Sequence, residues 1–448
     1  MKKTDLRIID VKLTLSEIAF RTPLKLSSGE ISLITYAKAQ VVAEDAAGRR
    51  GAGQGAVLLS DLWAFSQSSL SHDVRDKAMR LLTEKIGLEA KATAEAGDPF
   101  EIGRRLEARL GDLAERVRAE LGLAEPIPRL AWLVCFSPWD AAIHDAWGVI
   151  AGRDTYSIYT SEFLNRDLGA YLGPAFAGKY PADYLRPPRT SIAVQHVVGG
   201  NDPLRPEDVP AGFPRDGIPN SLEDWMAQDG VYWLKLKVTG RDLEWDLRRI
   251  VDVYRLAAEF AERTGRGRRP MLSIDPNEAC PTPDYIVELL KSLKERDSEA
   301  YASLQYVEQP TPRDVSSYTF TLHETAALKP VVMDESLDRL EYLDLVDRQG
   351  WSGIAVKTCK GQTHVMLAYC WAREHGRFVT IQDLTNPGLA LVHSAQLARR
   401  LDLSAECIEF NSRQYIPLGC VEERAGHETL FQVRDGVLYY GGKGAGLY

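Results

Sequence analysis

The chain lacks several features that mark other classes of protein. No stretch approaches about 18 uninterrupted apolar residues, the length that a membrane-spanning helix needs, and segment 1–7 lacks the apolar run of a secretory signal. The six cysteines are scattered through 448 residues without a CxxC pair, which argues against zinc fingers and a disulfide framework. We expect reduced, mostly buried thiols, no contact with a membrane and a cytoplasmic location.

A surplus of positive charge is also missing. Lysine and arginine total 54 against 63 aspartate and glutamate residues, which gives a net charge of −9 and a pI near 5.6. Nucleic-acid binding needs a wide basic surface, so this function is not expected. The 45% hydrophobic and 26% charged residues are typical of a globular protein with a sizeable core. At roughly 150 residues per domain, or about 250 for a barrel, the length predicts two domains.

The first part of the chain has the pattern of an α+β domain. Apolar and polar residues alternate over 7–13 and 34–42, as in half-buried strands. Helical stretches with one apolar face follow over 73–123. We place this domain at residues 1–135.

Two segments connect these elements to the rest of the chain. A helix is predicted over 137–148, with Ser137 as its N-cap and Pro138 in its first turn, and we expect it to join the two domains. The Pro-rich segment 201–220 is longer than a usual connection between a strand and a helix. It is interpreted either as a lid over a site or as a passive surface insertion.

From about residue 189 onward, short apolar strands alternate with amphipathic helices, the pattern of a parallel sheet built from βα units. Eight strands are predicted to begin near Ser191, Val231, Met271, Leu304, Pro330, Gly353, Phe378 and Cys407. Eight is the strand number of a closed (β/α) barrel. We therefore predict a barrel over 136–414, with segment 415–448 packing back on the N-terminal domain.

Charged residues occupy the ends of these predicted strands. In the second strand, Lys235 and Lys237 share one face because side chains alternate in a strand. Burying two ammonium groups is costly unless they are paired or neutralised, which favours a functional role. The carboxyl ends of all strands face the same end of a barrel, where functional side chains gather.

The next three strands end in Asp275, Glu308 and Asp334. Neighbouring strands lie about 4.8 Å apart, so these carboxylates can converge on one point. Without a cation they would repel one another and one would take up a proton. A hard divalent cation with oxygen ligands resolves this conflict, and Mg²⁺ fits because it leaves positions open for water or substrate.

The sixth strand ends in Lys357. The second and sixth strands of a closed eight-stranded barrel lie opposite each other. Lys237 and Lys357 are therefore predicted to face each other across the metal site.

These residues carry a family resemblance. The chain resembles the enolase superfamily, and within it the muconate-lactonizing-enzyme-like subgroup of the mandelate racemase/muconate lactonizing enzyme family. The motifs are Lys235-x-Lys237, Asp275-x-Asn277, Glu308-Gln309-Pro310, Asp334-Glu335-Ser336 and Lys357, and segment 140–148 is similar to the helix that leads into the family's barrel. The resemblance implies a modified TIM barrel with an N-terminal α+β capping domain.

The resemblance also implies roles for these residues. Asp275, Glu308 and Asp334 would be Mg²⁺ ligands, and Lys237 and Lys357 the acid/base pair. Lys235 would lower the pKa of its neighbour and contact the substrate carboxylate. Asn277, Glu335 and Asp383 are further candidates for supporting the ligands or contacting substrate. Two capping loops, at 20–28 and 51–58, would close over the barrel and help to select the substrate.

The implied activity is Mg²⁺-dependent removal of a proton next to a carboxylate, through an enediolate. Racemisation or epimerisation is the leading hypothesis, with a sugar-acid dehydratase or a cycloisomerase as the alternative and a non-catalytic barrel as the least favoured. We expect a small carboxylate substrate and a homo-oligomer. The chain departs from the family's dipeptide epimerases, because the acidic pair after the eighth strand is missing, and Lys357 replaces the His/Asp dyad of the mandelate-racemase subgroup.

One further motif is discounted. Gly51, Gly53 and Gly55 follow a predicted strand, but their GxGxG spacing differs from the GxGxxG of dinucleotide-binding proteins.

Overall fold

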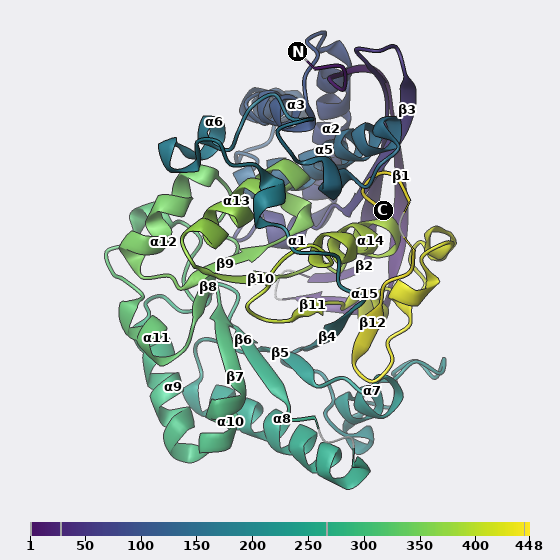
Figure 1. Ribbon diagram of the computed structural model, residues 1–448. Helices are drawn as coiled ribbons and strands as arrows, with labels where there is room; N and C mark the ends of the chain where they lie inside the picture. The colour runs from purple at the N-terminus through teal and green to yellow at the C-terminus, as the bar shows by residue number, and fades with distance from the viewer. Residues whose placement is uncertain (1, 27–28, 266–267, 443) are drawn as a thin grey trace.

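The computed structural model describes residues 2–26, 29–265, 268–442 and 444–448. Its N-terminal part is an antiparallel sheet in the order β1 (Leu6–Leu26), β2 (Gly29–Asp45) and β3 (Arg50–Leu58). The helices α2 (His72–Ala92), α3 (Pro99–Glu107) and α4 (Leu110–Leu121) follow the sheet in the chain (Figure 1). This is the predicted α+β domain.

The strands of this domain are longer than the sequence pattern indicated. The prediction of two capping loops is wrong, because the described residues of both segments lie in strands. Residues 20–26 belong to β1 and 51–58 to β3, because both segments pair with β2, from Leu24↔Ile31 to Leu26↔Gly29 and from Tyr36↔Leu58 to Ala43↔Gly51. Residues 27–28 of the first expected loop lie outside the described residues.

The helix that joins the domains, α5 (Arg129–Ala151), begins eight residues before the predicted N-cap Ser137. Pro138 therefore lies inside the helix and supplies no N–H for the carbonyl of Val134. The Ser137 hydroxyl donates to that carbonyl instead, at 2.9 Å. A buried apolar run before Ser137 explains the earlier start, since burial on almost all sides stabilises the helix in spite of the proline.

The glycines of β3 allow this strand to pack directly on α5. A Cβ atom on Gly53 would collide with the backbone of Ala142 and Ala146, and one on Gly55 with the carbonyl of Pro138. The GxGxG motif is thus explained by close contact between backbones.

Substituting Gly53 tests this packing. We expect Gly53→Ala to lower the free energy of unfolding by about 1–3 kcal/mol, because the backbone of α5 must move to admit a methyl group. Urea unfolding measures the change. Gly111→Ala on α4 is the matched control: its Cβ would meet only Trp132 at 3.4 Å, and alanine is the better helix former, so stability should stay equal or rise. Equal loss in both variants would contradict the interpretation.

Eight parallel strands form the closed barrel that the sequence predicts. They run in chain order around the barrel, and the last pairs with the first through Cys407↔Ala193 and the two pairs that follow. The strands are β4 (Ser191–Val198), β5 (Trp233–Lys237), β6 (Met271–Asp275), β7 (Leu304–Glu308), β8 (Val331–Met333), β9 (Gly353–Val356), β10 (Phe378–Ile381) and β11 (Cys407–Glu409). Their starts match the predicted ones within two residues.

Helices surround the barrel on the outside (Figure 1). They are α7 (Leu222–Asp229), α8 (Leu243–Thr264), α9 (Asp284–Arg296), α10 (Ser298–Ser303), α11 (His323–Leu328), α12 (Leu343–Gln349), α13 (Gln362–Glu374) and α14 (Gly388–Ala398). Two further short helices are α6 (Gly169–Leu172) before the barrel and α15 (Ser412–Tyr415) after it.

The C-terminal segment contacts both parts of the molecule. Its strand β12 (Val437–Tyr439) pairs antiparallel with β4 of the barrel. The Glu423 carboxylate accepts hydrogen bonds from Tyr36 at 2.6 Å, from Lys38 at 2.7 Å and from the backbone of Leu389 in α14 at 2.8 Å. A half-buried carboxylate thus links the N-terminal sheet to the barrel.

The long segment 201–220 is held from the N-terminal domain. The guanidinium of Arg21 in β1 donates to Asp216 at 2.6 and 2.8 Å and to the carbonyls of Ile218 and Pro219. The segment therefore bridges the strand ends of the barrel and the tip of the N-terminal sheet.

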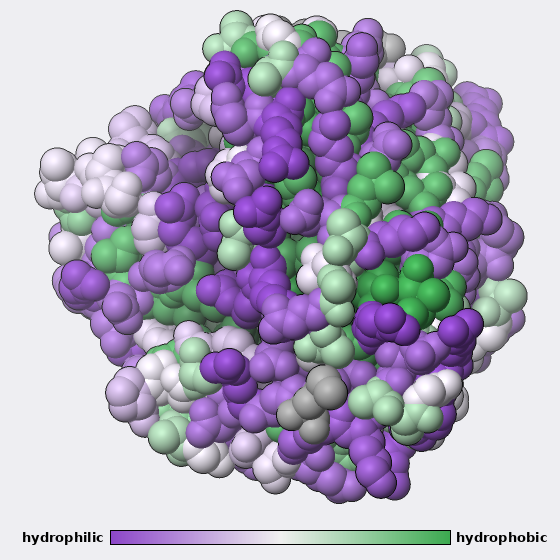
Figure 2. All heavy atoms as spheres, turned by 90° about the horizontal axis from the view of Figure 1, so that it is seen from above, coloured by the Kyte–Doolittle hydropathy of each residue, from purple (hydrophilic) through white to green (hydrophobic). Residues whose placement is uncertain are grey.

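Hydrophilic and hydrophobic side chains are unevenly distributed over the surface. Figure 2 shows a face covered mainly by hydrophilic side chains, with hydrophobic ones in separate patches. Among the described residues, no helix combines the length and the apolar character needed to cross a membrane. All six cysteines are free, and five of them are buried.

Candidate active site

The charged residues predicted from the strand ends gather at one end of the barrel. Lys237 is the last residue of β5, Asp275 of β6 and Glu308 of β7, while Asp334 and Lys357 directly follow β8 and β9. Because β5 and β9 stand four strands apart in a closed ring of eight, Lys237 and Lys357 come from opposite walls.

Lys235 lies deepest, with 1% of its surface exposed. Its ammonium group donates to Glu308 Oε1 at 2.9 Å and to Glu409 at 3.2 Å, and lies 3.1 Å from Asp275. Burial lowers the pKa of Lys235, but the surrounding carboxylates outweigh it and hold the pKa well above its ordinary value. This lysine is therefore a buried cation that balances three carboxylates.

Lys237 is the more accessible of the two β5 lysines, with about a third of its side chain exposed. It donates to Asp275 Oδ2 at 2.5 Å and to Asn277 Oδ1 at 2.7 Å. Burial raises the pKa of Asp275, but Lys237 and Lys235 outweigh it and hold the pKa at about 2. The carboxylate is ionised at neutral pH.

Asp334 is held in the same way on the opposite side. Lys357 donates to Asp334 Oδ2 at 2.5 Å, and Lys360 donates to Asp334 Oδ1 at 3.1 Å and to its carbonyl at 2.6 Å. Burial raises the pKa of Asp334 and lowers that of Lys357, because it disfavours the charged form of each group. The attraction between the opposite charges outweighs burial, so the pKa of Asp334 lies well below its ordinary value and that of Lys357 lies above it. In this arrangement Lys357 is an ammonium group, not yet a base.

Glu308 is the least satisfied carboxylate of the group. Lys235 Nζ lies 2.9 Å from each of its oxygens and donates a hydrogen bond to Oε1, whereas its contact with the buried Oε2 is an ion pair without hydrogen-bond geometry. Burial raises the pKa of Glu308, and the neighbouring charges of Asp275 and Asp334 add to this against the opposing effect of Lys235. A buried carboxylate oxygen that is held by an ion pair alone is a suitable ligand for a cation.

Lysine ammonium groups stand between these carboxylates. Within the described part of the chain, no three acidic, histidine or cysteine side chains are already arranged to hold one metal ion. A cation bound by Asp275, Glu308 and Asp334 must therefore displace lysine contacts from them.

The loops after the strands have unusual backbone conformations. Asn277 and Glu278 after β6, Gln309 after β7 and Thr385 after β10 have positive φ angles of 46°, 66°, 28° and 60°. Such conformations are costly for residues other than glycine and cluster at functional sites. Gln309 also fixes its neighbour Asp334, because its side-chain carbonyl accepts the backbone N–H of that residue at 2.9 Å.

Three residues near the site were not identified from the sequence. Lys360 binds Asp334, Trp63 in α1 (Asp61–Ala64) donates its indole N–H to Glu335 at 2.9 Å, and Arg313 holds the backbone of α1. The sequence shows that Lys360 follows Lys357 by three residues, but not which carboxylate it binds. Trp63 and Arg313 gave no signal in the sequence.

The remaining candidate residue, Asp383, lies after β10 and beside Glu409 of β11. Asp383 is buried, its side chain accepts hydrogen bonds from Asn386, and its backbone N–H donates to the Glu409 carboxylate at 3.3 Å. Burial, with Glu409 next to it, raises the pKa of Asp383 to about 7. Two acidic residues of neighbouring strands thus lie together, although no acidic pair is present after the eighth strand itself.

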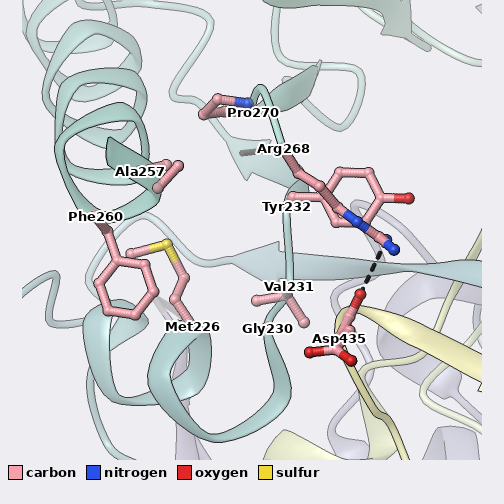
Figure 3. Close-up of a pocket in the computed structure, with 10 residues that line it drawn as sticks. Met226, Gly230, Val231, Tyr232, Ala257, Phe260, Arg268, Pro270 and Asp435 are labelled. Carbon is pink, nitrogen blue, oxygen red and sulfur yellow. Dashed lines mark hydrogen bonds between the residues drawn. The ribbon is translucent and has the colours of Figure 1, made fainter. Parts of the chain in front are cut away.

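A cavity of about 260 Å³ lies elsewhere, at the start of β5 (Figure 3). Its walls include Val231, Phe260 and Pro270, and Arg268 crosses its rim to donate to the Asp435 carbonyl at 3.0 Å. The residues before β5 and β6 are at the opposite end of the barrel from the strand-end carboxylates. We therefore do not assign the chemistry to this cavity.

A comparison with family models decides the relationship. The model described as enolase C-terminal domain-like matches residues 218–447, more than half of the chain. The chain belongs to the enolase superfamily. The resemblance found in the sequence motifs is thereby confirmed, and the chain is an enzyme of this superfamily. No curated protein matches it significantly.

Solved structures of other enolase-superfamily proteins share the fold at low identity. Muconate lactonizing enzyme from Pseudomonas fluorescens, solved with muconolactone, has a TM-score of 0.59 and 15% identity over 98% of this chain and 95% of that chain. Dipeptide epimerase from Enterococcus faecalis, solved with Mg and the dipeptide L-Leu-L-Tyr, has a TM-score of 0.59 and 16% identity over 98% of this chain and 99% of that chain. An enolase from Bradyrhizobium, solved with magnesium and mandelic acid, has a TM-score of 0.60 and 17% identity over 100% of this chain and 96% of that chain.

Proposed function

We propose that this enzyme removes a proton next to a carboxylate with the help of Mg²⁺, and that it racemises or epimerises a small carboxylic acid. The observation that carries the proposal is the pair of lysines on opposite walls of the barrel. Lys237 and Lys357 are each within 2.5 Å of a carboxylate at the strand ends. Two bases on opposite sides allow a proton to leave one face of a carbon and to return to the other.

The residues present fit a bound Mg²⁺ ion. Asp275, Glu308 and Asp334 supply the oxygen ligands that this ion prefers, and the buried Glu308 Oε2 has an ion pair with Lys235 but no hydrogen bond among the described residues. When bound, Mg²⁺ would stabilise the negative charge that develops on the substrate carboxylate. The magnesium in the E. faecalis and Bradyrhizobium structures supports this proposal.

The lysines then have separate tasks. A cation held by Asp275, Glu308 and Asp334 would release Lys237 and Lys357 from their carboxylates, and each lysine would then be available as the base for one face of the substrate carbon. Lys235, which is buried beside Glu409, would attract a substrate carboxylate by its charge. Glu335 and Asn277 orient the residues around the ligands.

A dehydratase or cycloisomerase would use the same lysines differently. One lysine would remove the proton while the other protonates or releases a group on the neighbouring carbon. The muconate lactonizing enzyme among the similar structures keeps this alternative open.

Proton exchange in D₂O tests the proposal. We expect incubation of a panel of chiral carboxylic acids with enzyme and Mg²⁺ to place deuterium on the α-carbon of at least one acid and to interconvert its stereoisomers, as measured by NMR and polarimetry. Appearance of a keto acid or a lactone without interconversion would select the alternative. Exchange that proceeds equally well after chelation of Mg²⁺ would contradict the metal-dependent mechanism.

A further inference from the structure

A short helix of the N-terminal domain lies over the strand-end site. The helix α1 (Asp61–Ala64) directly follows β3 and is fixed to α2 through Asp61, which accepts from Arg75 at 2.7 Å and contacts His72 at 3.0 Å. Both Asp61 and Arg75 are buried. The N-terminal domain therefore fixes one side of α1.

The barrel holds α1 from the other side through one arginine. Arg313, in the loop after β7, donates to the carbonyls of Trp63 at 3.1 Å and Ala64 at 3.4 Å. Two hydrogen bonds to the Glu278 carboxylate, at 2.7 and 2.6 Å, fix the guanidinium itself. These contacts join α1 to the loops that follow β6 and β7.

The Trp63 side chain contacts the opposite half of the site. Lys357 Nζ lies 4.5 Å from the centre of its ring, within the range of a cation–π interaction. Its indole N–H donates to Glu335 Oε1 at 2.9 Å, an oxygen that also accepts from Asn277 at 3.3 Å. Asn277 in turn accepts from Lys237 at 2.7 Å. One side chain of the N-terminal domain therefore connects the surroundings of both proposed bases.

We propose that Trp63 is a positioning residue, which places Lys357 with its ring face and Glu335 with its N–H. This inference rests on the proposed function for its catalytic consequence. The placement of Lys357 can be measured without substrate or metal. Loss of the ring should affect Lys357 more than Lys237, because the ring lies against Lys357 at 4.5 Å and, less closely, Lys360 at 5.9 Å, whereas Lys237 contacts Asp275 and Asn277.

An NMR experiment on the whole enzyme tests the placement. With lysine labelled by ¹³C at the ε-carbon, the Lys357 signal is identified as the one that is lost in Lys357→Arg. We expect its ε-protons to be shifted upfield by the indole ring current in the wild type and in Trp63→Phe, and to return to the position of an ordinary lysine in Trp63→Leu. An unshifted signal in the wild type, or a shift that survives Trp63→Leu, would overturn the proposal whatever the reaction is.

The catalytic consequence is tested with the acid that shows exchange in D₂O. We expect Trp63→Leu to slow exchange of one stereoisomer, the one handled by Lys357, about 10- to 100-fold more than that of the other, with Trp63→Phe between Trp63→Leu and wild type. Trp132→Phe is the matched control, because this half-buried tryptophan of α5 donates only to the Ile127 carbonyl at 2.7 Å. Equal slowing of both stereoisomers by Trp63→Leu would show a loss of folding alone and would reject the positioning role.

Discussion

Replacing Lys357 with alanine is expected to slow interconversion of the two stereoisomers about 10²- to 10⁴-fold, the usual contribution of a general acid or base. Lys237 alone would then transfer protons, and only at one face of the α-carbon. Exchange with D₂O should therefore persist for one stereoisomer and stop for the other. NMR of each pure stereoisomer in D₂O measures both rates.

Lys237→Ala is the mirror image of this experiment and serves as its control. It should stop exchange of the stereoisomer that Lys357→Ala leaves intact, because the two lysines come from opposite walls of the barrel. If both variants stop exchange of the same stereoisomer, the lysines act on one face and a two-base mechanism is wrong. Circular dichroism of each variant checks that the fold is unchanged.

Replacing Glu308 with glutamine is expected to abolish Mg²⁺ binding and to lower activity at least about 10³-fold, because the change removes one of three carboxylates at a buried site while keeping its shape. In the wild type, Mg²⁺ at 100 times its Kd should raise the free energy of unfolding by about 2.7 kcal/mol. In Glu308→Gln this increase should disappear. Thermal unfolding with and without Mg²⁺ measures it.

Glu324→Gln is the control for this variant. Glu324 is an exposed carboxylate that pairs with Lys291 on the surface, so its loss should leave both Mg²⁺ stabilisation and activity within error of the wild type. Chelation of the wild type should remove activity reversibly. An increase of stability by Mg²⁺ in Glu308→Gln as large as in the wild type would place the ion elsewhere.

The barrel was predictable because its strands carry a strong local signal. Strands β6, β7, β9, β10 and β11 begin at the predicted residues, since each is a short apolar run bounded by helices. The parity of Lys235 and Lys237 follows from the two-residue repeat of a strand, and the order of the strands follows from the regular βα alternation. Local rules therefore sufficed to bring together the residues of the strand ends.

What could not be predicted depends on contacts between distant parts of the chain. Trp63 and Glu335 are 272 residues apart, and no local pattern relates them. The start of α5 depends on burial between the sheet and the barrel, which overrides the signal of Pro138. The lysine–carboxylate pairs could not be read from spacing either, because the choice of partner for Lys360 depends on the turn after β9.

The closure of the barrel has a consequence for how the chain folds during synthesis. β4 pairs with β11, whose residues are made more than 200 positions later than those of β4. Until that point a growing chain exposes an unpaired strand edge next to buried apolar surface, the condition under which nascent proteins aggregate. The N-terminal sheet and α5 are synthesised before any strand of the barrel, so β3 can pack on α5 early. We therefore expect the ribosome-bound chain to carry a folded N-terminal domain and an open, chaperone-dependent barrel.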